Sequence, residues 1–191
     1  TLTYGSTATS RVTPAGVTAY LSWLVDKIED RVGNSQTYAY RSIGSGENLI
    51  DTITYTGLGS TLGNRTVTFG YQTRQQADSG AKDISSSALA GGLSMQTQAL
   101  AWIKTAVDGI TVRKYTPDYG TAVYSGRLLM TSLQECAGDS SPCHPATLFS
   151  YNDGALNFQL KSLQGLGLPS IEPKKGEEAQ ENYRVRLAGD F

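Results

Sequence analysis

The residues with the most chemical potential in this 191-residue chain are two cysteines and a histidine that lie close together. Cys136 and Cys143 enclose six residues, among which Gly138 and Pro142 allow a bend, and His144 follows directly. A loop of this length can bring the two Cα atoms within disulfide range, and the bond would stabilise the fold by roughly 2–3 kcal/mol in an oxidising compartment. Two reduced cysteines in a turn, or a partial metal site with His144, are the alternatives, although zinc would need further ligands that the spacing does not supply.

His144 also limits any nucleophilic mechanism, because it is the only histidine in the chain. A Ser–His–Asp arrangement would have to use it, yet it follows Ser140 closely, whereas in trypsin-like proteases the histidine precedes the serine by a long stretch. The chain contains no Gly-x-Ser-x-Gly elbow. Its glycine-rich stretches at 57–63 and 91–92 lack both a following helix start and a Lys-Ser/Thr pair, so neither is typical of a phosphate-binding loop.

Paired carboxylates, the groups that glycosidases use, occur at Glu29–Asp30 and Glu177–Glu178. Adjacent residues of a strand point to opposite faces, so Glu29 and Asp30 cannot easily share a substrate. The second pair lies in a charged run that is typical of a solvated linker. The sequence therefore predicts that this chain is not an enzyme and that it holds no cofactor.

The overall composition argues against several classes of partner. The 16 basic and 17 acidic residues leave a net charge of −1, which gives no reason to expect binding to nucleic acid or to an anionic membrane. No apolar run approaches the roughly 18 residues of a membrane span, and no signal peptide opens the chain. Because Thr1 is not an initiator methionine, we expect the N-terminus to be a cut or processed end.

The elements that must position these residues are strands. Threonine and the 11 tyrosines favour strands, and the 21 glycines favour turns. The alternation of apolar and polar residues predicts an all-β fold, an antiparallel meander of roughly nine to eleven short strands with no long helix. The strands are expected at residues 23–28, 35–41, 49–56, 66–72, 102–107, 110–115, 127–135, 146–151 and 155–160.

Two tight turns are the clearest local signals. At the first, Gly33 and Asn34 both tolerate positive φ, and Asp30 is expected to order the turn by accepting hydrogen bonds from backbone amides. At the second, Asp108–Gly109 is the strongest short hairpin signal in the chain. A further turn is expected at residues 118–120.

Other segments have weaker signals. Residues 73–92 are polar and rich in serine and glycine, so they are expected to form a long loop or insertion within a β-domain of residues 1–168. Residues 93–101 fit either a helix or a strand. Prolines and a charged run at 169–182 predict a linker, after which residues 183–191 regain a strand pattern.

Apolar and aromatic side chains predict one packed face of the sheet. That face is expected to consist of Ile53, Tyr55, Val67, Phe69, Tyr71, Leu129 and Leu133. Tyrosines recur along the strands, at Tyr38, Tyr40, Tyr55, Tyr71, Tyr115, Tyr119, Tyr124 and Tyr151. Aromatic rings of this kind could stack on sugars, but in a sheet they more often form cross-strand pairs that support it.

Three stretches of the sequence resemble SpvB-type and Rhs/YD-repeat proteins. Residues 23–40 (Trp-Leu-Val-Asp-Lys-Ile-Glu-Asp-Arg-Val-Gly-Asn through Tyr-Ala-Tyr) are similar to the family pattern W…I.DR.GN…Y.Y, and residues 46–55 continue it. Residues 113–136 are similar to the pattern R.Y…SRL.SI.EC. Residues 136–151, which contain both cysteines, are similar to the closing pattern C…C.PPT.F.W.

The resemblance covers roughly residues 20–160, with the motifs in the family's order. There are two departures: Ser-Gly-Arg at 125–127 replaces the common Ser-Arg pair, and the segment 78–99 lacks the expected arginine-rich strand. The final residues 186–191 look like the opening of an FG-GAP/VCBS repeat, in which Asp190 would be the first ligand of a calcium loop. Calcium would therefore be expected only in a continuation after Asp190.

The resemblance implies a structural role in a large assembly. Such segments belong to the B component of Tc-type toxin complexes, to SpvB-type virulence proteins and to Rhs-like shells, where they contribute β-sheet to a hollow shell around a toxic polypeptide. The effector enzyme of those proteins lies at their far C-terminus, and nothing in this chain resembles it.

On this basis we expect a scaffold module of a bacterial protein that is secreted or displayed at the cell surface. Its partners would be neighbouring β-modules of the same polypeptide or toxin-complex subunits, and an isolated fragment could form an edge-strand dimer. The alternative hypothesis is an extracellular adhesion or carbohydrate-binding module that uses the tyrosine-rich face.

Overall fold

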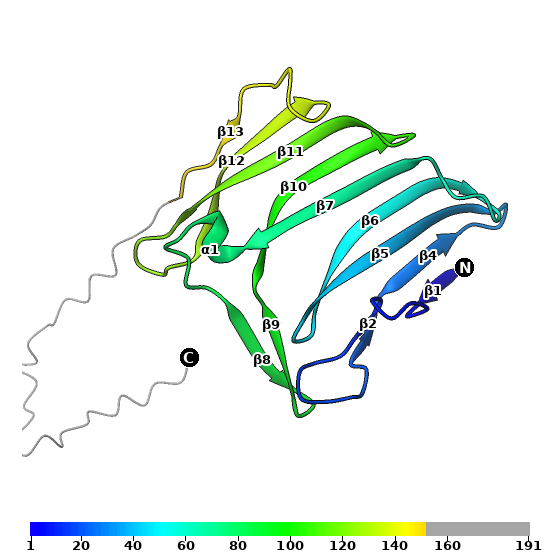
Figure 1. Cartoon of the computed structure of the whole chain (residues 1–191), viewed down its shortest axis with the longest axis horizontal. Helices are drawn as coiled ribbons and strands as arrows, with labels where there is room; N and C mark the ends of the chain where they lie inside the picture. The colour runs from blue at the N-terminus through cyan, green and yellow to red at the C-terminus, as the bar shows by residue number, and fades with distance from the viewer. Residues whose placement is uncertain (152–191) are drawn as a thin grey trace, which may run out of the picture. The chain divides into compact units, whose positions relative to one another are not determined.

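The computed structural model describes residues 1–151, which form strands in three antiparallel sheets and one short helix (Figure 1). In chain order the elements are β1 (Leu2–Tyr4), β2 (Arg11–Val12), β3 (Ser22–Trp23), β4 (Val25–Glu29), β5 (Asn34–Gly44), β6 (Glu47–Leu58), β7 (Arg65–Thr73), α1 (Arg74–Ala77), β8 (Ser85–Leu89), β9 (Gly92–Gln96), β10 (Gln98–Val107), β11 (Ile110–Thr121), β12 (Leu128–Ala137) and β13 (Thr147–Leu148). Among these residues no helix is long and apolar enough to cross a membrane.

The predicted strand at 155–160, the linker at 169–182 and the segment 183–191 lie outside the described residues. The same holds for the predicted domain boundary after residue 168. These assignments therefore stay predictions.

A nine-stranded antiparallel sheet dominates the fold. Its strands follow one another in the order β1-β4-β5-β6-β7-β10-β11-β12-β13, so each strand pairs with its neighbours in the chain apart from two excursions. The excursions are the two-stranded ribbons β2–β3 and β8–β9, which leave the main sheet and return to it (Figure 1). The predicted all-β antiparallel meander is confirmed, although several strands are longer than expected, with 12 residues each in β6 and β11.

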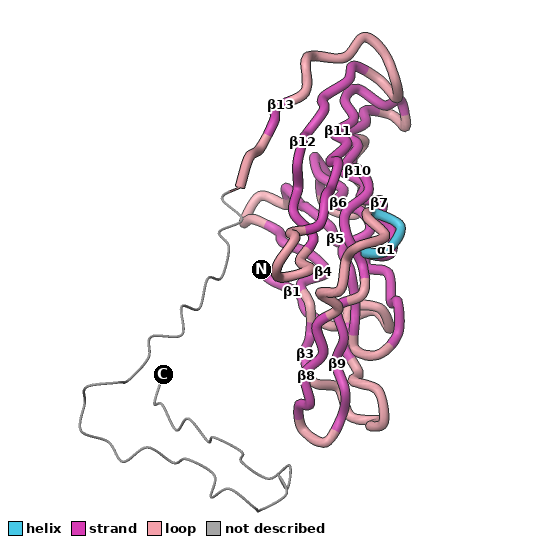
Figure 2. The backbone as a smooth tube through the Cα atoms, turned by 90° about the vertical axis from the view of Figure 1, so that its left-hand side faces the viewer, coloured by secondary structure: helices cyan, strands magenta, loops and turns pink. Residues whose placement is uncertain are grey.

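The main sheet is a single layer. Figure 2, turned by 90°, shows its strands edge-on with no second sheet or long helix packed against them. Within residues 1–151, the buried apolar side chains are small: Ala81, Ala99, Ala106, Ala122 and Cys136. Domains normally bury the apolar face of a sheet against a second layer, but within residues 1–151 no large apolar side chain is buried in this way.

Register pairing across the strands defines an apolar face. Ile53 pairs with Val67, and Phe69 pairs with Ile103, which in turn pairs with Tyr115. None of these side chains is fully buried within residues 1–151: each is only half-buried. The expected apolar face is therefore present and uncovered in the part of the chain that the structure describes.

The predicted apolar face is wrong for one residue, Leu129. Leu133 pairs with Pro117 on that face, whereas Leu129 pairs with Gly120 on the opposite one. The cause is an extra residue, Thr131, in β12, which shifts the alternation of side chains by one position. Counting by twos along the sequence cannot detect such an insertion.

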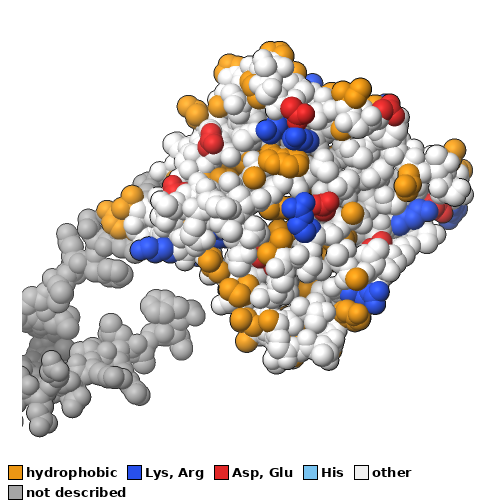
Figure 3. Space-filling view, in the orientation of Figure 1, with side chains coloured by type: hydrophobic (Ala, Val, Ile, Leu, Met, Phe, Trp, Pro, Cys, Tyr) orange, Lys and Arg blue, Asp and Glu red, His pale blue; other side chains and the backbone are white. Residues whose placement is uncertain are grey.

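The opposite face carries more polar side chains and one large aromatic residue. Trp102 in β10 lies beside Gly70 of β7, its register partner, where a side chain would leave no space for the indole. The Lys104 ammonium lies 4.9 Å from the centroid of the Trp102 ring. Figure 3 shows one face of the molecule in space-filling form, with hydrophobic side chains scattered between areas of uncharged polar surface.

Residues 73–92 do not form one long loop, which corrects the sequence-based expectation. Thr73 caps α1 by accepting a hydrogen bond from a first-turn amide, and β8 then pairs with β9 as a hairpin. Between them, Asp83 binds the Arg74 guanidinium (2.8 Å) and the amide of Leu128 (3.2 Å). Polar contacts order this segment, and the only apolar side chain that it buries within the described residues is the small Ala81, which is why its composition resembles a loop. The open segment 93–101 is strand, in β9 and β10.

The turn expected at residues 118–120 is also wrong. These residues lie inside β11, where Asp118 accepts a hydrogen bond from the Ser132 hydroxyl of β12 at 3.0 Å. The chain reverses later: the amide of Ala122 donates to the carbonyl of Arg127, and the amide of Gly126 donates to Ala122. Aspartate and glycine favour turns, but here cross-strand pairing determines the conformation.

Candidate assembly surface

The residues considered for chemistry lie apart from one another within residues 1–151. No group of three or more histidine, cysteine, aspartate or glutamate residues could hold a metal ion there. His144 is exposed, and its backbone amide donates to the carbonyl of Glu135 (2.8 Å). Two open hollows have volumes of about 320 and 350 Å³: the lining of the first includes Glu47 and Arg74, and that of the second includes Lys82 and Tyr124.

The predicted turn residues come together along one end of the sheet. Asp30 accepts hydrogen bonds from the amides of Val32 and Asn34, both at 2.9 Å, and Gly33 has a φ of +91°. Hydrogen bonding by Asn34 holds the pKa of the Asp30 carboxyl below its ordinary value. The carbonyl of Gly33 also accepts a hydrogen bond from Gly59, so the β4–β5 turn contacts the β6–β7 loop.

The next turn along this end is joined in the same way. Asp108 and Gly109, with φ of +51° and +78°, connect β10 to β11. The Asn64 side chain of the β6–β7 loop donates to the Asp108 carboxylate at 2.9 Å, and the Asp108 amide donates to the Asn64 carbonyl at 2.8 Å. The successive turns therefore form a continuous rim.

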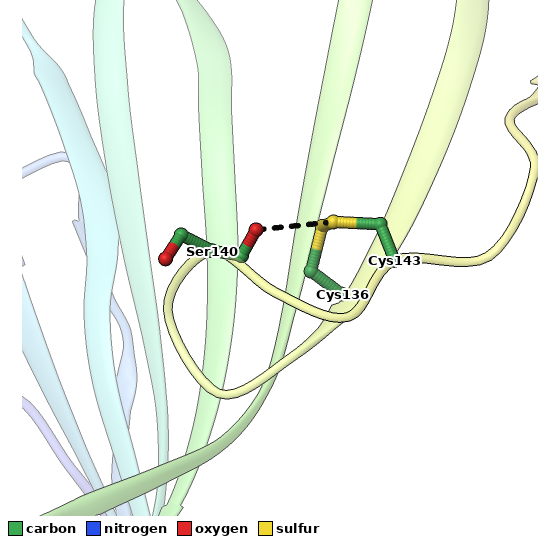
Figure 4. Close-up of a disulfide and its surroundings, with 3 residues drawn as sticks. All are labelled: Cys136, Ser140 and Cys143. Carbon is green, nitrogen blue, oxygen red and sulfur yellow. Dashed lines mark hydrogen bonds between the residues drawn. A yellow bond between two sulfur atoms is a disulfide. The ribbon is translucent and has the colours of Figure 1, made fainter.

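A disulfide closes the last loop of this rim. Cys136 and Cys143 are bonded, with their Cα atoms 3.9 Å apart, and the amide of Ala137 donates to the carbonyl of Pro142 inside the loop. Figure 4 shows the Ser140 carbonyl oxygen beside the disulfide, 3.3 Å from the Cys143 sulfur. Because a disulfide sulfur carries no proton, this is a packing contact and not a hydrogen bond.

The closed loop reaches back over two further strands. The Asp139 carboxylate lies 2.5 Å from the Lys104 ammonium of β10 and 3.3 Å from the Thr111 hydroxyl of β11. Hydrogen bonding by Lys104 holds the pKa of Asp139 below its ordinary value. The Gly138 amide also donates to the carbonyl of Val112, so the disulfide loop fastens the end of β12 to its neighbours.

A repeated irregularity crosses the middle of the sheet. At one point in each of the strands β4, β6, β10 and β12 the strand has an extra residue relative to the strand before it in the sheet, and these four bulge residues are Asp26, Asp51, Ala101 and Thr131. The residues immediately before them are Val25, Ile50, Leu100 and Met130. A bulge interrupts the ladder and leaves backbone groups to be satisfied in another way.

A tyrosine hydroxyl binds the carbonyl of the residue before each of these four bulge residues. The donors are Tyr40 to Val25 (2.9 Å), Tyr71 to Ile50 (2.7 Å), Tyr119 to Leu100 (2.8 Å) and Tyr151 to Met130 (2.9 Å). Tyr40, Tyr71 and Tyr119 lie in the strand that follows the bulged strand in the sheet, and Tyr151 lies three residues after such a strand, β13. A unit of one bulged strand and the strand after it therefore recurs four times: β4–β5, β6–β7, β10–β11 and β12–β13. We call these residues the tyrosine row.

The tyrosine row has no counterpart in the sequence-based interpretation. In the sequence, the β8–β9 ribbon separates the second two-strand unit from the third, so the units do not recur at a constant spacing. A single extra residue in a strand also does not change the amino-acid composition. Some of the tyrosines expected either to stack on sugars or to form cross-strand pairs therefore have a third role, which is to bind the backbone of a neighbouring strand. Burial raises the pKa of Tyr71 and Tyr119, which keeps these hydroxyls protonated as donors.

A Tyr71→Phe variant is expected to lose about 1 kcal/mol of stability, because the Ile50 carbonyl loses its hydroxyl partner in a half-buried position. Chemical denaturation followed by circular dichroism measures the difference. Tyr4→Phe is the matched control, since the Tyr4 hydroxyl has no partner within residues 1–151 and its loss should leave the stability unchanged. Equal stability of all three proteins would contradict the role of the row.

Asp26, the bulge residue of β4, also orders a nearby loop. Asp26 is buried, and its carboxylate accepts hydrogen bonds from the amide of Ser6 (2.5 Å) and the hydroxyl of Thr7 (3.4 Å), which orders the loop after β1. Burial by itself raises the pKa of Asp26, but hydrogen bonds from Ser10, Ser6 and Thr7 outweigh it and the pKa lies below its ordinary value.

The lowered pKa of Asp26 predicts a pH-dependent contribution to stability. The unfolded chain binds the proton more readily, so the contribution is complete above the ordinary pKa of 3.8 and is lost as the pH falls through the folded value. An Asp26→Asn variant should be less stable than wild type at neutral pH, and the difference should shrink as the pH falls below about 4. Urea denaturation at a series of pH values measures this; an undiminished difference in acid would contradict it. Asp51→Asn, at the corresponding bulge of β6, is the control and should have the smaller effect at neutral pH.

The main sheet has two outer strands, β1 and β13. Leu2, Thr3 and Tyr4 of β1 are all exposed, and no described strand pairs with the outer side of β1. The strand contains no charge and no proline, the residues that usually protect an edge against pairing. The outer side of β1 is therefore a template for another strand.

Comparison with known proteins supports the fold. No family model matches the sequence, and no curated protein matches it. Among solved structures, the N-terminal domain of the effector protein SpvB from Salmonella typhimurium strain LT2 is similar, with a TM-score of 0.53 and 13% sequence identity, over 78% of this chain and 58% of that one. The chain thus spans less than two thirds of the length of the protein it matches. The resemblance that the motifs indicated is confirmed at the level of the fold: residues of this chain adopt the all-β fold of the SpvB N-terminal domain.

Proposed function

We propose that this chain is a non-enzymatic scaffold module of a secreted bacterial toxin or virulence protein. It would contribute β-sheet to a larger shell that encloses or presents a toxic polypeptide. The observation that carries the proposal is the single-layer nine-stranded sheet, whose apolar face and β1 edge are uncovered within residues 1–151. Such a sheet is suited to extension by neighbouring modules and not to enclosing a reaction centre of its own.

Two further observations support this role. The chain shares its fold with part of an effector protein, and the Cys136–Cys143 disulfide fits an oxidising compartment outside the cell. The rim of linked turns and the tyrosine row stiffen the sheet in its own plane, which a wall requires when no second layer supports it. The partners would be adjacent β-modules of the same polypeptide or subunits of its complex.

Sedimentation velocity over a wide range of concentrations tests the proposal. The chain should associate as its concentration rises, through pairing at exposed edges. A Leu2→Lys variant should weaken association because it places a charge on the β1 edge, whereas Leu62→Lys, at a leucine that is also exposed but lies in a loop, should behave as wild type. A wild-type chain that stays monomeric at every concentration would contradict the proposal.

The alternative hypothesis, a carbohydrate-binding face, has less support. The hydroxyls of Tyr40, Tyr71, Tyr119 and Tyr151 bind backbone carbonyls and are not available to a sugar. Binding on a glycan array that disappears in a Tyr→Ala series would favour this alternative. A His144→Ala variant that loses any measured activity would favour an enzyme instead.

A further inference from the structure

Tyr4 occupies the first position of the tyrosine row but lacks the bond that the later members make. Four tyrosines of the main sheet pair in register with the residue before one of the four bulge residues: Tyr4 with Val25, Tyr40 with Ile50, Tyr71 with Leu100 and Tyr119 with Met130. Tyr40, Tyr71 and Tyr119 also donate their hydroxyls to the strand on their other side. No strand of residues 1–151 lies on that side of Tyr4, which is 54% exposed.

We propose that the outer edge of β1 binds an antiparallel strand of the type that β4, β6, β10 and β12 share. Such a strand carries an apolar residue followed by a one-residue bulge, and the carbonyl of the apolar residue accepts the hydrogen bond of the Tyr4 hydroxyl. This inference rests on the proposed scaffold function and specifies which strand a neighbouring module supplies.

The four tyrosines whose hydroxyls bind a neighbouring strand show what the partner strand must contain. It must run antiparallel to β1, because β4, β6, β10 and β12 each run antiparallel to both of their neighbours. It must contain the bulge, because in every unit the tyrosine hydroxyl reaches the carbonyl directly before the extra residue. Its apolar residue would lie beside Tyr4, next to which Leu2 and Ile28 form an exposed register pair.

The conformation of β1 is fixed by contacts at both of its ends. The loop after β1 is held by Asp26, which binds Ser6 and Thr7, so the outer strand is fixed before any partner arrives. The carbonyl of Thr1 accepts a hydrogen bond from the amide of Glu29 at 2.9 Å, which holds the other end of β1. A strand fixed at both ends loses little conformational freedom on pairing, which favours association.

A fluorescently labelled peptide with the sequence of residues 47–58 tests the inference by anisotropy against the full chain. This peptide is β6 and contains Ile50 followed by the bulge residue Asp51. We expect it to bind wild type about fivefold more tightly than Tyr4→Phe, which corresponds to one hydrogen bond. Tyr124→Phe, at a tyrosine of similar exposure outside the row, should bind as wild type does.

A second peptide, identical except that Asp51 is deleted, distinguishes binding that depends on this bulge from binding by strand pairing alone. It should bind wild type and Tyr4→Phe equally, because it offers no carbonyl to the Tyr4 hydroxyl. Equal binding of the complete peptide to wild type and Tyr4→Phe would overturn the inference. So would a chain that self-associates but does not bind the peptide, a result that leaves the scaffold proposal intact. A chain that neither binds the peptide nor self-associates would overturn both.

Discussion

A Gly63→Ala variant is expected to be less stable than wild type by about 3 kcal/mol, the upper end of the usual range for overpacking. A Cβ atom at Gly63 would lie 1.7 Å from the carbonyl oxygen of Tyr55 and 2.9 Å from the amide nitrogen of Gly57. Both are backbone atoms of β6, so no rotation of a side chain can relieve the clash. The β6–β7 loop would have to leave the strand, which also breaks the hydrogen bonds between Leu58 and Thr61.

Urea denaturation followed by circular dichroism measures the loss in Gly63→Ala. Gly120→Ala is the matched control, since the nearest atom to its Cβ would be the Thr131 methyl group at 3.2 Å, which can move. The control should lose much less stability than the Gly63 variant. Equal stability of the two variants would show that the loop does not pack against β6 as described.

Removing the disulfide is the second change with a large expected effect. Replacement of both Cys136 and Cys143 by alanine should cost about 2–3 kcal/mol, because the unfolded chain regains the freedom that the closed loop had removed. The same loss should appear when wild type is reduced. Release of the loop should also detach Asp139 from Lys104 and Thr111, so the effect should extend to the ends of β10 and β11.

Denaturation with and without a thiol reductant measures the contribution of the disulfide. Asp139→Asn in the oxidised protein separates the ion pair from the covalent bond, and it should have a much smaller effect, since exposed ion pairs contribute little. A double alanine variant that is as stable as oxidised wild type would show that the loop does not constrain the chain. Reductant should have no effect on that variant.

Much of the fold could be predicted from the sequence because local chemistry determines it. Val67, Phe69 and Tyr71 alternate with polar residues, and β7 has this pattern on its two faces. Asp108–Gly109 forms a two-residue turn at positive φ, a conformation that glycine and aspartate tolerate. In a meander each strand pairs with its neighbour in the chain, so correct strands and turns already give the sheet order.

The bulges could not be predicted, and the tyrosine row depends on them. One extra residue such as Thr131 changes neither composition nor average hydrophobicity, yet it moves Leu129 to the other face. Residues 118–120 have turn chemistry, but pairing with β12 keeps them in a strand. Both errors arise because the partner strand decides the local conformation, and single-strand patterns contain no information about the partner.

The sequence also could not predict that the sheet forms a single layer. An alternating strand indicates that one face is apolar, and that pattern is the same whether a second layer, a neighbouring module or solvent covers the face. Polar contacts of Asp83 and Arg74 likewise order a segment whose composition is that of a loop. What lies against a surface follows from the three-dimensional arrangement alone.

Amide hydrogen exchange of the isolated chain, measured by mass spectrometry at increasing concentration, tests the scaffold role most directly. The account predicts that at low concentration the inner strands β6, β7 and β10 are protected while β1 exchanges rapidly, because its outer side has no partner. As the chain associates, protection should extend to β1. A β1 strand that is already protected in the monomer, or that stays unprotected when the chain associates, would contradict the claim that this sheet is built to be extended at that edge.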